Sequence, residues 1–251
     1  MSLNLSKYEQ YIEDIYEKFK IYGFKKSLEY VFIELTRKIF FETIKKSYSQ
    51  KQEDIFIDNY FCNKKSGFYV DIGANNPHRF NNTKKFYNKG WHGINIEPDF
   101  VNYNKFIKDR KKDINLNIGI GVNHKQLKFY KFMPDTLSTF SKEESCRCIS
   151  LGHILKSEIN VEVKPLSQVL SKYCKKNKID FFSIDTEGFD MQVLESNNWN
   201  LFKPKLICIE SLKYDSMFIN NKKLSNHERF LKKVGYHKIY DNGLNSIFEI
   251  N

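Results

Sequence analysis

The sequence lacks the features that mark membrane-spanning and secreted proteins. No apolar run approaches the roughly 18 residues that a membrane span requires. The N-terminal stretch MSLNLSKYEQYIEDIYEKF is rich in charge and has no apolar core of the kind found in signal peptides. We therefore expect a cytoplasmic protein without a membrane span.

Cysteine is scarce and scattered, and this argues against both disulfides and zinc. The chain has five cysteines, at positions 62, 146, 148, 174 and 208. An odd and dispersed set does not form a disulfide framework. The only close pair, Cys146 and Cys148, has no second pair nearby, so buried or unreactive thiols are a better interpretation than a metal site.

Length and composition favour one large domain with an appendage. The chain has 251 residues, of which 41% are hydrophobic and 16% aromatic, and these values exclude wholesale disorder. We expect an N-terminal helical extension over residues 1–47 and the main domain over residues 48–251. Within 8–48 the apolar residues share one helix face, and Gly23 is a plausible break between two helices; the face comprises Leu28, Val31, Phe32, Leu35 and Ile39. An oligomer surface, hence a homo-oligomer, and a helical layer over the main core both fit this pattern.

The net charge of +11, from 41 basic and 30 acidic residues, has two explanations. One is an anionic partner such as nucleic acid, a phosphorylated sugar or a lipid surface. The other is compositional bias, because the chain is crowded with Lys, Asn, Ile, Phe and Tyr, as an AT-rich genome would produce. The lysines are spread along the chain, which favours bias, with a phosphate-bearing substrate as a second contributor.

From residue 67 onward, short apolar runs alternate with helical patterns. Strands are expected at 67–73, 93–98, 113–121, 127–132, 159–165, 179–185 and 205–211, and a hairpin at 237–242 and 245–250 around Gly243. Helices are expected at 81–90 with an Asn cap and a Gly stop, after Pro165, and at 226–236. Such alternation predicts a parallel sheet covered on both faces, which binds ligands beyond the carboxyl ends of its strands.

The turn after the first strand, Asp71-Ile72-Gly73-Ala74-Asn75, is the first candidate site. Gly73 permits a tight turn, but Asn75 and Arg79 stand near where a dinucleotide fingerprint needs two more glycines, so NAD and FAD are not indicated. An acid at Asp71 suits a ligand with an amino group better than a pyrophosphate. Glu97, at the end of the next strand, can accept both hydroxyls of a ribose. The two acids together favour S-adenosylmethionine as cofactor.

Several blocks, in order, resemble the FkbM family of S-adenosylmethionine-dependent methyltransferases. They are Tyr48-Ser49-Gln50 with Glu53-Asp54, YVDIGANNPHRFNNT (69–83), GWHGINIEPD (90–99), NLNIGIG (115–121), PLSQVL (165–170), IDFFSIDTEGFDMQVLE (179–195), LICIE (206–210) and NSIFEI (245–250). The resemblance covers roughly residues 48–250 and leaves out residues 1–47.

The resemblance implies the class I methyltransferase fold, a Rossmann-like α/β sheet of seven mostly parallel strands whose last strand is antiparallel. It also implies methyl transfer to an oxygen, commonly a sugar or polyketide hydroxyl. This compact form is most similar to bacterial members in gene clusters for capsule or lipopolysaccharide sugars. The implied acceptor is a hydroxyl of a nucleotide-activated or glycan sugar.

The family's cofactor residues carry over by position. They are Gln50, Asp54, Asp71, Gly73, Asn75, Glu97, Asn117 and Asp185. The residues after the first strand are expected to line the methionine end, Glu97 to hold the ribose and Asn117 to flank the adenine. Gln50 and Asp54 precede the first strand and are expected to close over the cofactor.

Carboxylates after the fourth and fifth strands are the main catalytic candidates. A sugar hydroxyl is a weak nucleophile, so a base that removes its proton assists attack on the methyl carbon. Asp185 and Glu187 are paired where a base belongs, and Glu210 is a third acid that could contact the acceptor. Crowding of like charges raises the pKa of one carboxyl toward neutrality. The same three acids could instead hold Mg²⁺ or Ca²⁺, an alternative that we rank below a metal-free base.

Loop residues supply further candidates. His78 is a natural base near pH 7, and Arg79 could grip a phosphate or carboxylate of the acceptor. Asn82 is a further candidate substrate contact, and so is His153, on a long segment (133–158) that we expect to form a lid.

Two other classes of function stay open at this point. A nucleic-acid methyltransferase is compatible with the charge, but Lys25, Lys26, Lys45 and Lys46 form no recognisable RNA-binding module, so no nucleic-acid partner is expected. A non-catalytic binding protein is disfavoured because the cofactor acids and the fourth-strand carboxylates are all present.

Overall fold

The computed structural model describes residues 46–62, 64–174, 178–211 and 226–251, together with Leu28, Val31, Phe32 and Thr36. The chain separates into two units, Met1–Ser47 and Tyr48–Asn251, and the fold below is that of the second. Most of the predicted helical region 8–48, with Gly23, Lys25, Lys26 and Lys45, lies outside the described residues. No helix among the described residues is long and apolar enough to cross a membrane.

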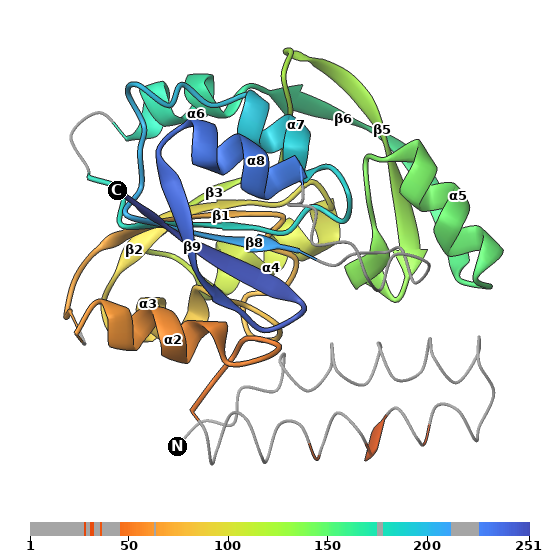
Figure 1. Cartoon of the computed structure of the whole chain (residues 1–251). Coiled ribbons are helices and arrows are strands. Elements are labelled where there is room, and N and C mark those ends of the chain that lie inside the picture. The colour runs from red at the N-terminus through yellow and green to blue at the C-terminus, as the bar shows by residue number, and fades with distance from the viewer. Residues whose placement is uncertain are drawn as a thin grey trace. The chain divides into compact units, whose positions relative to one another are not determined.

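A seven-stranded sheet forms the centre of this unit, in the order β3-β2-β1-β7-β8-β10-β9 (Figure 1). Its strands are β1 (Phe68–Ile72), β2 (His92–Ile96), β3 (Ile114–Leu116), β7 (Phe181–Ile184), β8 (Leu206–Glu210), β9 (Tyr236–Asp241) and β10 (Asn245–Ile250). Strands β3, β2, β1, β7 and β8 are parallel, and β10 pairs antiparallel with both β8 and β9. The expected fold, a mostly parallel seven-stranded sheet with an antiparallel last strand, is confirmed.

Helices cover both faces of the sheet (Figure 1). They are α2 (Glu53–Tyr60), α3 (Lys84–Asn88), α4 (Phe100–Asp109), α6 (Leu166–Tyr173), α7 (Asp190–Glu195) and α8 (Asn226–Lys233). Alternate residues of β1 serve the two layers: Val70 packs with residues of α6, α7 and α8, and Tyr69 packs with Ile57 of α2 and Phe86 of α3. The central strands β1, β7 and β8 are buried on both sides, which explains their near-continuous apolar sequences.

A smaller sheet of β4 (Gly119–Ile120), β6 (Ile154–Lys164) and β5 (Lys125–Met133) stands beside the larger one. With α5 (Lys142–Ser150) it forms the green part of Figure 1. The prediction of a long lid loop over 133–158 is wrong in detail, because this segment contains the 3₁₀ turn η2 (Asp135–Leu137), α5 and the start of β6. The N-cap of α5 is Ser141, whose hydroxyl accepts a hydrogen bond from the Glu144 backbone N–H.

Other local expectations have mixed outcomes. The strand expected at 113–121 is two short strands, β3 and β4, in different sheets. The helix expected at 81–90 spans only Lys84–Asn88, and Thr83 rather than Asn is its N-cap. The terminal hairpin around Gly243 is confirmed, and all five cysteines, which lie in the described part, are free.

Candidate active site

The register of the large sheet aligns the strand ends that carry the predicted site. Ile72 of β1 is paired with Ile96 of β2 on one side and with Ile184 of β7 on the other. Because these strands are parallel, the residues that follow them emerge at one edge of the sheet. Gly73, Glu97 and Asp185 are therefore neighbours along this edge, although 112 residues of sequence separate the first from the last.

A pocket of about 780 Å³ opens at this edge. Its floor comes from the strand ends, and its roof comes from residues 135–140, here called the roof segment, together with Phe129 of β5. The polar and acidic lining residues are Gln50, Asn75, Glu97, Asp99, Asn102, Asp135, Thr136, Ser138, Asp185, Thr186 and Glu187.

Gly73 allows the floor of the pocket to close tightly. Its φ is +77°, and a Cβ at this position would lie 1.8 Å from the carbonyl oxygen of Asp185. The backbone amides of Gly73 and Ala74 both donate to the carbonyl of Ile96, at 3.0 and 3.1 Å. No other residue type fits this turn, because a side chain would collide with the end of β7.

Glu97 lies on the floor with its carboxylate anchored from two sides. One oxygen accepts from the Asn75 backbone N–H at 2.7 Å, and the other accepts from the Asp99 backbone N–H at 2.7 Å. Burial raises the pKa of Glu97 to about 8, against the opposing effect of these two bonds. Each carboxylate oxygen has a further lone pair, so Glu97 can accept two more hydrogen bonds from a ligand.

Asp185 and Glu187 line the pocket after β7. Oδ1 of Asp185 is buried and has no hydrogen-bond partner in the part of the chain that the structure describes. Burial, and then the charges of Asp190 and Asp71, raise the pKa of Asp185 to about 7. Burial, and then the charges of Asp185 and Glu210, raise the pKa of Glu187 well above its ordinary value. Asp185 can therefore exchange a proton near neutral pH.

The ionisable side chains of the described pocket lining are all acidic. Five carboxylate residues line it, and no lysine, arginine or histidine does so among the described residues. This contrasts with the net charge of +11 of the chain. A low-dielectric pocket with this lining favours a cationic ligand and disfavours a phosphate.

The loop before α2 brings Gln50 to the pocket, and Asp54 holds that loop in place. Asp54 is buried; it accepts from the Tyr48 backbone N–H at 2.7 Å and from the Ser49 hydroxyl at 2.9 Å. Gln50 lines the pocket and Asp54 does not.

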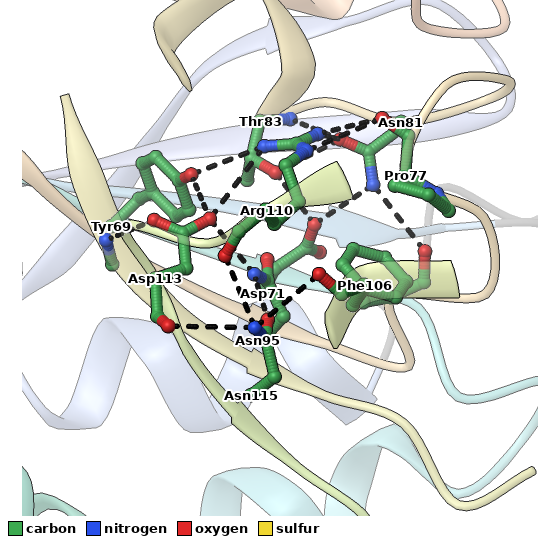
Figure 2. Close-up of polar contacts among 12 residues, drawn as sticks. Tyr69, Asp71, Pro77, Asn81, Thr83, Asn95, Phe106, Arg110, Asp113 and Asn115 are labelled. Atoms are coloured by element: carbon green, nitrogen blue, oxygen red, sulfur yellow. Dashed lines mark hydrogen bonds and ion pairs between the residues drawn. The ribbon is translucent and has the colours of Figure 1, made fainter. Parts of the chain in front are cut away.

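Asp71 belongs to a buried polar network behind the pocket rather than to the lining (Figure 2). Its Oδ2 accepts from the Asn81 amide at 3.1 Å and from the Thr83 hydroxyl at 2.8 Å. Asn81 in turn accepts from Arg110 at 2.8 Å, and Arg110, whose side chain is completely buried, also donates to the carbonyl of Pro77 at 3.0 Å. The network holds in place the loop that follows β1 and contains Asn75.

The other predicted cofactor residues differ in position. Asn75 lines the pocket, with a φ of +50°. Asn117 does not line it; its amide donates to the carbonyls of Glu97 and Pro98, each at 2.9 Å. Its neighbours, from Ile118 to Ile120, do line the pocket, so the expected adenine side of the site is occupied by residues next to Asn117.

The predicted base His78 and the predicted substrate contacts lie outside the lining. His78 contacts Asp109 of α4 at 2.7 Å, with both side chains more than a quarter exposed. Arg79 lies 3.8 Å from Asp135 of the roof segment, and Asn82 donates to the Ser183 hydroxyl at 3.1 Å.

His153 and Glu210 are also outside the lining. His153 is half-buried just before β6, and Glu210 is buried at the end of β8, in line with Asp185. No three His, Cys, Asp or Glu side chains of the described residues are grouped so that they could hold a metal ion. The alternative of a divalent cation held by Asp185, Glu187 and Glu210 thus gains no support from the geometry.

Sequence reasoning missed the roof segment and the start of α4. Asp99 caps α4 and forms an ion pair with Lys131 at 2.7 Å, and Asn102 donates to Asp135 at 3.2 Å. Asp99, Asn102 and Asp135 all line the pocket. The sequence signal for Asp99 was its place after a strand and before a helix, but the roof segment has no such pattern.

The chain matches a protein-family model. This model, described as the methyltransferase FkbM domain, matches residues 71–238, which begin near the end of β1 and include β2, β7 and β8. No curated protein matches the chain.

Proposed function

Since the chain belongs to the FkbM family of methyltransferases, we propose that it transfers a methyl group from S-adenosylmethionine to a sugar hydroxyl. The acceptor that we propose is a nucleotide-activated or glycan sugar of a bacterial surface polysaccharide. Support for this class comes from the similarity of residues 69–83 and 90–99 to members found in capsule and lipopolysaccharide gene clusters.

The observation that carries the proposal is the alignment of Gly73, Glu97 and Asp185 at one sheet edge, with Oδ1 of Asp185 buried and unpartnered among the described residues. A buried polar atom without a partner costs free energy unless a ligand satisfies it. S-adenosylmethionine fits these groups: its ribose matches the free lone pairs of Glu97, and its positive charges match the acidic lining. When bound, it supplies an electrophilic methyl carbon on a sulfonium sulfur.

The chain's own residues would then orient the acceptor and take its proton. Asp185 and Glu187 lie side by side at the pocket wall, and both carboxyls have raised pKa values. Asp185, with a pKa of about 7, is ionised in part of the population at neutral pH and binds a proton strongly enough to assist attack by a hydroxyl oxygen. Residues of the roof segment line the same pocket.

The absence of basic side chains from the described lining bears on the acceptor. The acidic lining disfavours a phosphate, so only the sugar part of a nucleotide-activated acceptor would enter, and its phosphates would stay outside the pocket. Arg79, which lies at 3.8 Å from Asp135 beside the roof segment, is the cation best placed to meet them.

Calorimetric titration with S-adenosylmethionine and with S-adenosylhomocysteine tests the cofactor first. Micromolar binding of both supports the proposal, and no binding of either by the folded protein contradicts it. The protein is then incubated with labelled S-adenosylmethionine and either nucleotide-activated sugars or RNA, with and without a chelator. Label in the sugars supports the proposal, label in RNA alone would replace it with a nucleic-acid methyltransferase, and loss of activity with the chelator would establish a metal.

A further inference from the structure

Thr139 of the roof segment connects two parts of the chain that are 48 residues apart. Its side chain is completely buried. Its backbone N–H and C=O both bond to Tyr130 of β5, at 3.0 and 2.8 Å, in an isolated antiparallel bridge. The position of Thr139 is thus set by main-chain bonds that any residue type could form.

The Thr139 hydroxyl has a different function. It donates to the carbonyl oxygen of Glu187 at 2.7 Å and accepts from the Ser141 backbone N–H at 2.9 Å. The direction of both bonds is unambiguous, because a carbonyl can only accept and an amide N–H can only donate. The hydroxyl therefore attaches the loop after β7 to the roof segment.

This loop needs an external attachment because its backbone is strained. Glu187 has a φ of +50° and Gly188 a φ of +85°, so two consecutive residues are left-handed. Glycine adopts this conformation freely, whereas a residue with a side chain is disfavoured there by roughly 1–2 kcal/mol. A glutamate stays in this conformation only where its surroundings hold it.

The conformation determines where the Glu187 carboxyl lies. It is placed at the pocket wall among acidic groups from four elements: Asp185 after β7, Asp190 of α7, Glu210 of β8 and Glu144 of α5. A right-handed backbone at Glu187 would direct the side chain elsewhere.

We propose that Thr139 is a positioning residue, whose hydroxyl keeps the Glu187 carboxyl at the pocket wall by holding the Glu187 carbonyl. The inference rests on the proposed function, in which Glu187 faces the acceptor. It adds a residue of the roof segment, outside the pocket lining, that determines the geometry of a candidate base.

The test is a pH titration of the Glu187 carboxyl, monitored by NMR in protein that carries ¹³C-labelled glutamate. The carboxyl signal of Glu187 is assigned by its absence from the spectrum of Glu187→Gln. Thr139→Val removes the hydroxyl at nearly constant volume. We expect the pKa of Glu187 to fall toward its ordinary value in this variant, as the carboxyl leaves its buried position and its acidic neighbours. Thr139→Ser, which keeps the hydroxyl, is expected to titrate like the wild type.

Ser141→Ala is the matched control. It removes the N-cap of α5 two residues away and loosens the same segment, but leaves the bond from Thr139 to Glu187 in place. We expect a lower melting temperature and an unchanged Glu187 titration. If Thr139→Val does not fold, Thr139→Ala takes its place, because the bridge to Tyr130 uses only main-chain atoms.

Two results would overturn the inference: a Glu187 titration in the Thr139 variants that matches the wild type, or an equal fall in Ser141→Ala. Titration with S-adenosylmethionine on the same samples keeps the two proposals apart. If the wild type binds the cofactor but Thr139→Val titrates at Glu187 like the wild type, only the inference about Thr139 is contradicted. Failure of the wild type to bind contradicts the proposed function.

Discussion

The carboxylate of Glu97 accepts a hydrogen bond from the backbone N–H of Asn75 at 2.7 Å, and this bond joins the ends of two neighbouring strands. Asn75 is left-handed, with a φ of +50°, and the bond helps to hold it there. Glu97 therefore shapes the cofactor turn as well as offering its free lone pairs to a ligand.

Glu97→Ala is expected to weaken the binding of S-adenosylmethionine by one to two orders of magnitude, or roughly 1.5–3 kcal/mol. The reason is the loss of a charged acceptor for two ribose hydroxyls. Calorimetric titration measures the change. Asp109→Asn, on α4 and outside the pocket, is the control and is expected to bind like the wild type. An unchanged affinity of Glu97→Ala would refute the ribose assignment.

Binding of S-adenosylmethionine is expected to release protons between about pH 6 and pH 9. The pKa of Asp185 is about 7 and that of Glu97 about 8, so both carboxyls are partly protonated in the free protein. A cationic ligand favours the ionised forms, so affinity is expected to rise with pH across this range and to level off above it. Titration in two buffers of different ionisation enthalpy counts the protons.

S-adenosylhomocysteine is the control for this experiment, because it has the same amino group but no positive sulfur. It is expected to release fewer protons, and Asp185→Asn is expected to release fewer with S-adenosylmethionine. A binding enthalpy that is the same in both buffers would contradict the assignment of raised pKa values to the pocket.

Gly73→Ala is expected to be far more damaging than Gly243→Ala. Both glycines are left-handed, with φ near +80°, but a Cβ at Gly243 meets nothing within 4 Å, whereas one at Gly73 would overlap the Asp185 carbonyl. Backbone strain alone costs about 1–2 kcal/mol, which is the loss expected for Gly243→Ala. Gly73→Ala adds a clash with main-chain atoms, so its total is expected to exceed about 4 kcal/mol. Urea denaturation compares them, and equal losses would show that the close approach to Asp185 has no energetic role.

Arg110→Met is expected to destabilise the protein by about 3–5 kcal/mol, because it leaves Asp113 buried without its cation. Arg110 also holds the loop at Pro77 and Asn81, as Figure 2 shows. Weaker binding of the cofactor is therefore expected to accompany the loss of stability. Urea denaturation measures the change in unfolding free energy. Lys128→Met removes an exposed ion pair with Glu158 and is expected to leave stability unchanged. A stable Arg110→Met protein would mean that the buried network contributes little.

The sequence was most informative where burial and periodicity act together. The strands around Val70, Ile94 and Ile207 are buried on both faces, so their apolar runs were visible, and parallel pairing then placed their carboxyl ends together. That reasoning located Gly73, Glu97, Asp185 and Glu187 at the pocket.

The same reasoning could not separate a lining residue from a supporting one. Asp71 and Asn117 stand at strand ends, as ligand-binding residues do, but their side chains turn toward Asn81 and toward the Glu97 carbonyl. That choice depends on tertiary hydrogen bonds between distant segments, which leave no local pattern. The roof segment escaped prediction for the same reason, since its position depends on the pairing of Tyr130 with Thr139 and not on any periodicity.

The two halves of the pocket also differ in how freely they can change during evolution. Floor residues such as Gly73 and Glu97 belong to strand ends with several structural functions each, so almost any substitution there is costly. The roof segment enters as one continuous stretch between β5 and α5. Under the proposed function, replacements at the lining positions Asp135, Thr136 and Ser138 would alter which acceptor enters, while the strand ends proposed to hold S-adenosylmethionine stay unchanged. One scaffold could thus methylate different acceptors with the same methyl donor site.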